Sequence, residues 1–199
     1  MSDSTDISTL SPELIREFVI ASHADLQKVQ EMLAQHPALL TVEHDWGEFG
    51  REDGIGAAAH VGNRAIAEFF LAQGVPMTIC VAAMLGRLDD VNAFLQQDHA
   101  LANARGAHGI TVMFHAAMSG NLALAQALQE HGCREGFSHA IHAAISGGHK
   151  DMVAWLLANG GSDVNVLDYQ GKTPLTHALD DNQPAIADLL REHGAKETV

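Results

Sequence analysis

Histidine is the side chain of this sequence with the most chemical potential, because thirteen histidines occur in 199 residues. His139 and His142 are three residues apart, a spacing that places both on one face of a helix. Imidazole binds transition metals and changes charge between pH 5 and 8. One hypothesis is therefore a metal-binding or pH-sensing protein. The histidines concerned would be His108, His115, His139 and His142.

A zinc site needs three or four ligands that converge at short range, and the sequence does not display such a set. A histidine that hydrogen-bonds the backbone or faces solvent is the simpler interpretation. We therefore predict no metal site and no cofactor, and keep the histidine-based function as the alternative.

Motifs for nucleotide binding and nucleophilic catalysis lack their required context. The glycine-rich segment 54–62 would have to follow a buried strand, but residues 48–53 are mostly charged. The Gly-Lys-Thr at 171–173 lacks the glycine that a phosphate-binding loop carries five residues earlier. Cys133 has His131 nearby but no third group to orient the pair. We predict no catalytic residues and a protein that is not an enzyme.

The elements that carry these side chains form a repeat. A helix with a pair of small residues, a helix-ending residue and a second apolar helix recur from about residue 13 to 195, which is typical of a stacked repeat protein. The spacings between successive helix-ending residues are 38, 24, 34, 28 and 34. Those residues are Ala24, Gly62, Gly86, Gly120, Gly148 and Asn182.

The last copies carry short motifs: Thr-Pro-Leu at 173–175, Gly-His at 148–149 and a closing Gly-Ala at 194–195. Together with the helix pairs, they resemble the ankyrin repeat, as in small bacterial ankyrin-repeat proteins of unassigned function. The resemblance implies an all-α solenoid of about six helix-turn-helix repeats. It also implies a backbone-bonding role for His142, which stands at the fourth position of the motif Thr-Pro-Leu-His.

The irregular spacings predict that some β-hairpin fingers of the repeat are short or missing. We expect plain turns between Gly74 and Pro76 and between Gly132 and Ser138. The first connection is instead longer than usual, and residues 43–53 combine two aromatic residues with five acids. This segment suits recognition of a partner, or its aromatic residues cover the core of the first unit; the sequence leaves both open.

The domain organisation follows from the repeat. We expect a disordered N-terminal tail at residues 1–10 and a single repeat domain at residues 11–199. The expected units are 11–46, 47–75, 76–104, 105–133, 134–166 and 167–199.

Composition excludes several classes of partner. The net charge of −14 argues against nucleic acid and anionic membranes, and favours a basic protein partner. No apolar run is long enough to span a bilayer, and the N-terminus does not resemble a secretory signal. The two cysteines fall in different units, so a reducing cytoplasm is expected. The oligomeric state does not follow from the sequence.

The resemblance implies binding of a protein along the concave face, which the finger tips and first helices build. We therefore predict a protein–protein interaction module whose groove centres on the middle units. The predicted contact residues are Trp46, Phe49, His60, Met84, Leu85, His108, Ile110, Met118, Tyr169 and Lys172.

Overall fold

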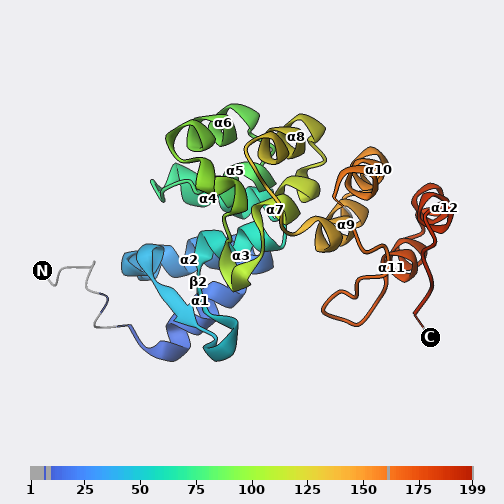
Figure 1. Ribbon diagram of the computed structural model, residues 1–199. Helices are drawn as coiled ribbons and strands as arrows, with labels where there is room; N and C mark the ends of the chain where they lie inside the picture. The colour runs from blue at the N-terminus through green and yellow to red at the C-terminus, as the bar shows by residue number, and fades with distance from the viewer. Residues whose placement is uncertain (1–6, 8–9, 161, 199) are drawn as a thin grey trace, which may run out of the picture.

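The computed structural model describes residues 7, 10–160 and 162–198, and its described part contains twelve α-helices in six consecutive pairs. The predicted tail, residues 1–10, falls outside the described residues except at positions 7 and 10. The pairs are α1 (Pro12–Ala24) and α2 (Leu26–Gln35); α3 (Gly54–His60) and α4 (Arg64–Ala72); α5 (Ile79–Met84) and α6 (Leu88–Gln97); α7 (Val112–Ser119) and α8 (Leu122–Glu130); α9 (Phe137–Ser146) and α10 (Lys150–Asn159); α11 (Pro174–Asp180) and α12 (Pro184–Glu192). The prediction of an all-α repeat solenoid is confirmed, and each expected unit range holds one pair (Figure 1).

The turns inside the last five pairs contain residues with left-handed backbone, whereas Asp25, between α1 and α2, has φ −118°. The helix-ending residues Gly62, Gly86, Gly120 and Gly148 have φ angles between 68° and 76°. Asn182 takes the same position with φ 53°, which asparagine tolerates better than most side chains. The side chains of Asn63 and Asn121 then cap the N-termini of the second helices α4 and α8. The sequence spacing therefore located these turns correctly.

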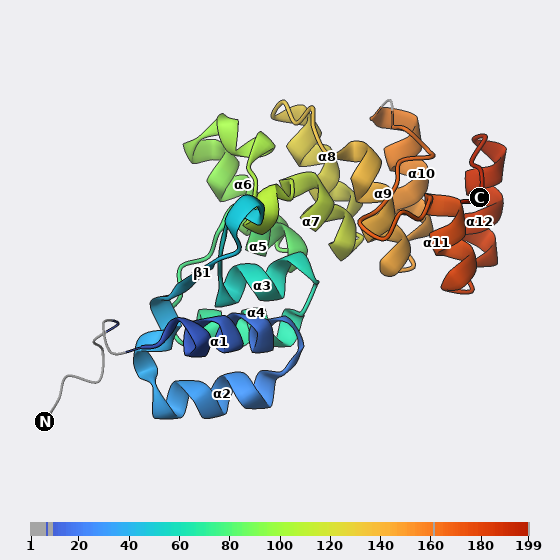
Figure 2. The same cartoon turned by 90° about the horizontal axis from the view of Figure 1, so that it is seen from below.

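The helix pairs follow one another along the chain in Figure 2, and the core lies between successive pairs. The first helices contact one another from pair to pair, α5 with α7 and α7 with α9 among them. Alanines such as Ala82 and Ala116 are fully buried there and let the backbones approach closely. Larger side chains of the second helices, such as Leu95 and Leu128, are also fully buried. Each pair consequently depends on its neighbours for a complete core.

Three fingers connect the pairs. The first finger (residues 43–53) is an antiparallel hairpin of β1 (Glu43–Asp45) and β2 (Arg51–Asp53), joined by the 3₁₀ turn η3 (Gly47–Phe49). The second finger (residues 105–111) holds η5 (Ala107–Gly109) and one bridge, Arg105 to Thr111. In the third finger (residues 166–172) the amide of Asp168 donates to the carbonyl of Lys172 at 2.9 Å.

Two connections have no finger, as their length predicted. Among the described residues, those between α4 and α5 and between α8 and α9 contain no strand. Two further 3₁₀ turns, η2 (Pro37–Thr41) and η4 (His99–Asn103), follow α2 and α6. None of the described helices combines the length and apolar composition that crossing a bilayer requires. The third and fifth pairs therefore present their first helices, α5 and α9, without a finger of their own.

Candidate binding site

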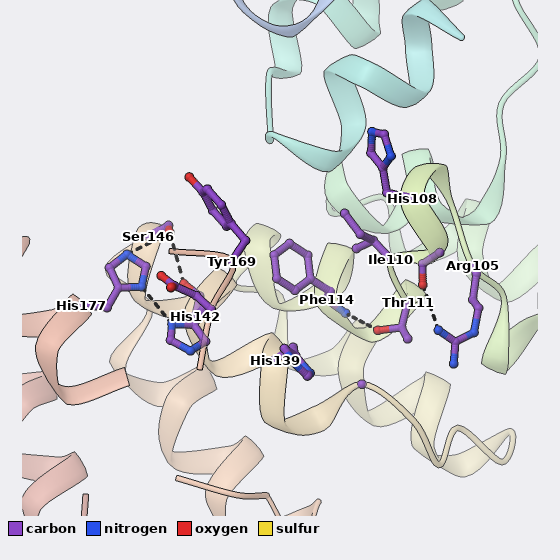
Figure 3. Close-up of a pocket in the computed structure, with 13 residues that line it drawn as sticks. Arg105, His108, Ile110, Thr111, Phe114, His139, His142, Ser146, Tyr169 and His177 are labelled. Carbon is purple, nitrogen blue, oxygen red and sulfur yellow. Dashed lines mark hydrogen bonds between the residues drawn. The ribbon is translucent and has the colours of Figure 1, made fainter. Parts of the chain in front are cut away.

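The missing finger of the fifth pair leaves a cavity of about 440 Å³ over α9, between the second and third fingers. We call it the α9 cavity, and Figure 3 shows the side chains around it. Helices α7, α9 and α11 contribute to its walls. The lining residues are Arg105, His108, Gly109, Ile110, Thr111, Phe114, Gly136, His139, His142, Ser146, Asp168, Tyr169 and His177.

The second finger forms one wall and is held by polar contacts. The guanidinium of Arg105 pairs with Glu135 and donates to the carbonyl of Gly109 at 2.9 Å. Thr111 caps α7, because its hydroxyl accepts from the amide of Phe114 at 3.4 Å. Ile110 and Phe114 are half-buried and face the cavity. This wall therefore offers an apolar surface beside a cation that is already paired.

The third finger and α11 form the opposite wall. The Oδ1 atom of Asp168 accepts from the amides of Gln170 and Lys172, each at 2.8 Å. These bonds fix a tight turn whose tip carries Tyr169. Tyr169 is 95% exposed, and an aromatic residue is seldom so exposed unless it contacts a partner. The turn thus presents an aromatic ring at the mouth of the α9 cavity.

Two stacked histidines lie at the base of this wall. The Nδ1 atoms of His142 and His177 are 3.1 Å apart, and His142 Nε2 lies 3.0 Å from the carbonyl of Val166. A carbonyl only accepts, so His142 Nε2 carries the proton. Burial lowers the pKa of His142, and this effect outweighs the bond to Val166. His142 is therefore uncharged at neutral pH.

The predicted contact residues have different surroundings in the structure. His108, Ile110 and Tyr169 line the α9 cavity. Met84 and Leu85 are 1% and 4% exposed, so the prediction that they contact a partner in the groove is wrong.

Their burial has a local cause. Both side chains belong to the core cluster that also contains Ala58 and Phe70, and the guanidinium of Arg64 lies over the C-terminal end of α5. Arg64 donates to the carbonyls of Met84 and Leu85 at 3.2 Å and 2.9 Å.

The other predicted residues lie outside the α9 cavity. Trp46 is half-buried against the core, with the guanidinium of Arg16 5.7 Å from its ring centre, whereas Phe49 is 65% exposed. The buried residues form two clusters, one in the N-terminal and one in the C-terminal part of the repeat, and the half-buried Met118 packs against both. The groove is therefore not centred on Met118. Lys172 pairs with Asp180 at 2.7 Å. His60 contacts the carboxylate of Glu52 at 2.9 Å.

The four histidines predicted to act together do not form one set of metal ligands, although three of them line the α9 cavity. His115 is 1% exposed; burial lowers its pKa to about 4, and its Nδ1 lies 2.9 Å from the carbonyl of Thr111. His108, His139 and His142 line the α9 cavity, and His108 in addition contacts the carboxylate of Glu52. The structure instead assembles two sets of potential ligands, and of their six members the sequence analysis had singled out only His60 and His142. The sets are His23, Glu52 and His60, and His142, Asp168 and His177.

Neither cysteine is set up as a nucleophile. Cys80 and Cys133 are both buried free thiols. Burial raises the pKa of Cys80 to about 12, and it also raises the pKa of Cys133. A thiol that stays protonated reacts slowly.

Comparison with known proteins identifies one part of the chain. Residues 133–199, which hold the last two helix pairs, match the family model of ankyrin repeats in three copies. No curated protein matches the chain. The matched region contains the Thr-Pro-Leu and Gly-His motifs, and the four preceding pairs repeat its helix-turn-helix architecture.

Proposed function

We propose that this chain, whose residues 133–199 match ankyrin repeats, binds an extended segment of another protein in the α9 cavity. Ankyrin repeats indicate a protein–protein interaction module, and the family is generally non-enzymatic. The observation that carries the proposal is the α9 cavity itself, because it lies between two fingers and has an exposed tyrosine at its mouth.

The lining selects the chemistry of the segment. Ile110, Phe114 and Tyr169 provide apolar contact for one side chain of the partner, and tyrosine is among the residues that dominate binding energy at interfaces. An aliphatic or aromatic side chain of the partner fits this surface. The remaining contacts would be made by backbone groups of the segment with the polar lining.

The charge near the site favours a basic segment. Arg105 and Lys172 are already paired with Glu135 and Asp180, so neither offers a free cation. Asp181, which lies 3.3 Å from His177, adds a further carboxylate beside the α9 cavity. The whole chain has a net charge of −14, which accelerates association with a basic partner at low salt. The two buried free thiols agree with residence in the reducing cytoplasm.

A displayed library of random peptides, selected on the immobilised full chain, tests the proposal. Affinities of a selected peptide are then measured for the wild type and for the variants Ile110→Ala and Tyr169→Ala. Truncation of an anchor residue costs about 1–4 kcal/mol of binding free energy. The control is Ile20→Ala, which removes an apolar side chain of α1 that is 45% exposed and does not line the cavity.

The expected result is a basic peptide whose affinity falls in both cavity variants and stays unchanged in Ile20→Ala. Equal affinity for the wild type and both cavity variants would contradict the α9 cavity as the binding site. Capture from cell lysate with the wild type and the double variant Ile110→Ala/Tyr169→Ala then identifies the natural partner.

A further inference from the structure

Three histidines surround one buried carboxylate away from the base of the α9 cavity. Glu52 of β2 is 2% exposed. Its Oε1 lies 2.9 Å from His60 Nε2 and 3.0 Å from His108 Nε2. Its Oε2 lies 3.7 Å from His23 Nε2, which is itself 3.0 Å from His60 Nε2. We call these four residues the Glu52 cluster.

The hydrogen bonds of the histidines determine where their protons are. His23 Nδ1 lies 2.9 Å from the carbonyl of Val19, and His108 Nδ1 lies 3.0 Å from the carbonyl of Phe49. A carbonyl only accepts, so both Nδ1 atoms carry a proton. In neutral imidazoles the Nε2 atoms of His23 and His108 then present lone pairs, and both belong to the group of atoms around the Glu52 carboxylate.

Too few protons remain for the atoms that meet here. Only His60 is free to carry its proton on Nε2, and two acceptors compete for it, His23 Nε2 and Glu52 Oε1. Although two nitrogens lie within 3.0 Å, Glu52 Oε1 has no aligned hydrogen-bond donor. A buried acceptor without a donor is costly. A cation at the centre would satisfy all of these lone pairs together.

The charge of Glu52 points the same way. Burial raises the pKa of its carboxyl, but the contact with His60 and the attraction that the three imidazoles exert when they are protonated outweigh burial. The pKa of Glu52 consequently lies below its ordinary value, and the group is a carboxylate at neutral pH. A buried carboxylate is stable when it is paired or coordinates a metal.

We propose that the Glu52 cluster binds one divalent transition metal ion, with Zn²⁺ as the best match. His23 Nε2, His60 Nε2 and the Glu52 carboxylate are the ligands, and their ligand atoms lie within 4.8 Å of one another. His108 is not a member of this set, but its Nε2 lies 3.0 Å from Glu52 Oε1 and makes it the candidate for a fourth ligand.

The distances and the ligand types suit zinc. Ligands about 2.0–2.2 Å from a tetrahedral zinc ion are about 3.3–3.6 Å from one another. The neighbouring pairs of the cluster, at 2.9, 3.0, 3.0 and 3.7 Å, are close to this range. Imidazole nitrogens with one carboxylate are common zinc ligands.

Hydrogen bonds from neighbouring groups orient the proposed ligands, as is usual in metal sites. Imidazoles that bind metals donate their second N–H to a carbonyl or carboxylate, as His23 and His108 do, and ligating carboxylates are hydrogen-bonded in turn. Here Trp46 Nε1 donates to Glu52 Oε2 at 2.8 Å. His108 also has a positive φ of 56°, an unfavourable backbone state of the kind found at functional sites. Trp46 is therefore a positioning residue of this site.

The site would join parts of the fold that are not consecutive. His23 lies in the last turn of α1, Glu52 in the first finger and His60 at the end of α3. His108 lies in the second finger, ahead of the fourth pair. The third pair has no finger, so nothing separates the first finger from the second. A metal ion here fastens three pairs together.

Equilibrium dialysis of the chelator-treated full chain against Zn²⁺ tests this proposal, with circular dichroism to show that each variant is folded. We expect one zinc ion per wild-type chain and at least about 100-fold weaker binding in His60→Ala and Glu52→Gln. Trp46→Phe keeps every ligand and should weaken binding by about 10- to 100-fold. The matched control is His142→Ala/His177→Ala, which removes two histidines of the other set and should leave the affinity unchanged.

Two results would overturn the proposal. One is a folded wild-type chain that binds no stoichiometric zinc, which would make the Glu52 cluster a network of charged imidazoles. The other is zinc binding that survives His60→Ala and Trp46→Phe but is lost in the control, which would move the site to His142 and His177. Substitution by Co²⁺ gives a second readout, because its visible absorption bands should change in His108→Ala if His108 occupies the fourth position.

Discussion

The carboxylate of Glu52 in the first finger lies 3.0 Å from the imidazole of His108 in the second finger. These fingers meet because the third pair, between them, has none. Over α5 they leave a cavity of only about 150 Å³, whereas over α9 the second and third fingers stay apart around about 440 Å³. The missing finger at the third pair thus lets the first and second fingers touch, whereas the missing finger at the fifth pair leaves an open cavity between the second and third fingers.

The proposed metal makes stability depend on zinc. A ligand at 100 times its Kd that binds only the folded state raises the free energy of unfolding by about 2.7 kcal/mol. Thermal unfolding should therefore shift upward when zinc is added to the chelator-treated wild type. His60→Ala should abolish this shift, while His142→Ala/His177→Ala should preserve it. Identical unfolding curves with and without zinc would speak against the site.

His115 should make the fold sensitive to acid. Its pKa is lowered from 6.5 to about 4 by burial, so the unfolded chain binds a proton that the folded chain does not. The free energy of unfolding consequently falls as the pH drops from about 6.5 to about 4, by about 3 kcal/mol from this group. His115→Asn removes the titration. Urea unfolding at several pH values should show a smaller loss in the variant; parallel curves would contradict the assignment.

Gly136 should be among the least replaceable glycines. It precedes α9 with φ 85°, and a Cβ atom there would overlap the side chain of Thr111, which caps α7. Gly148 has a φ of 68°, but a Cβ atom added to Gly148 would have no other atom within 4 Å. Gly148→Ala should cost about 1–3 kcal/mol from backbone strain alone. Gly136→Ala adds overpacking of about 1–3 kcal/mol. Equal denaturant midpoints for the two variants would refute this difference.

Arg105 should separate binding from stability. Its ion pair with Glu135 is about half exposed, and such pairs contribute about 0–1 kcal/mol to folding. Arg105 also holds the carbonyl of Gly109 and lines the α9 cavity. Arg105→Ala should therefore leave the melting temperature nearly unchanged but alter the affinity for a peptide selected on the wild type. A large drop in melting temperature would show that the contact is structural.

The sequence determined the order of the helix pairs and the two missing fingers. These properties are local. A glycine or Asn182 with positive φ follows the first helix of every pair except the first, and the connections ahead of α5 and α9 are too short to hold a finger. The burial of Met84 and Leu85 did not follow from the sequence, because it depends on how neighbouring pairs cover the end of α5.

The two ligand sets depended on tertiary structure in the same way. His23 and His60, or His142 and His177, are far apart in the chain and meet only when repeats stack. The periodic pattern predicts which residues share a helix face, but side chains from different pairs come together through the rotation between units and the reach of each finger. The sequence by itself thus determined the repeat, and only the tertiary structure decided which of its histidines surround Glu52.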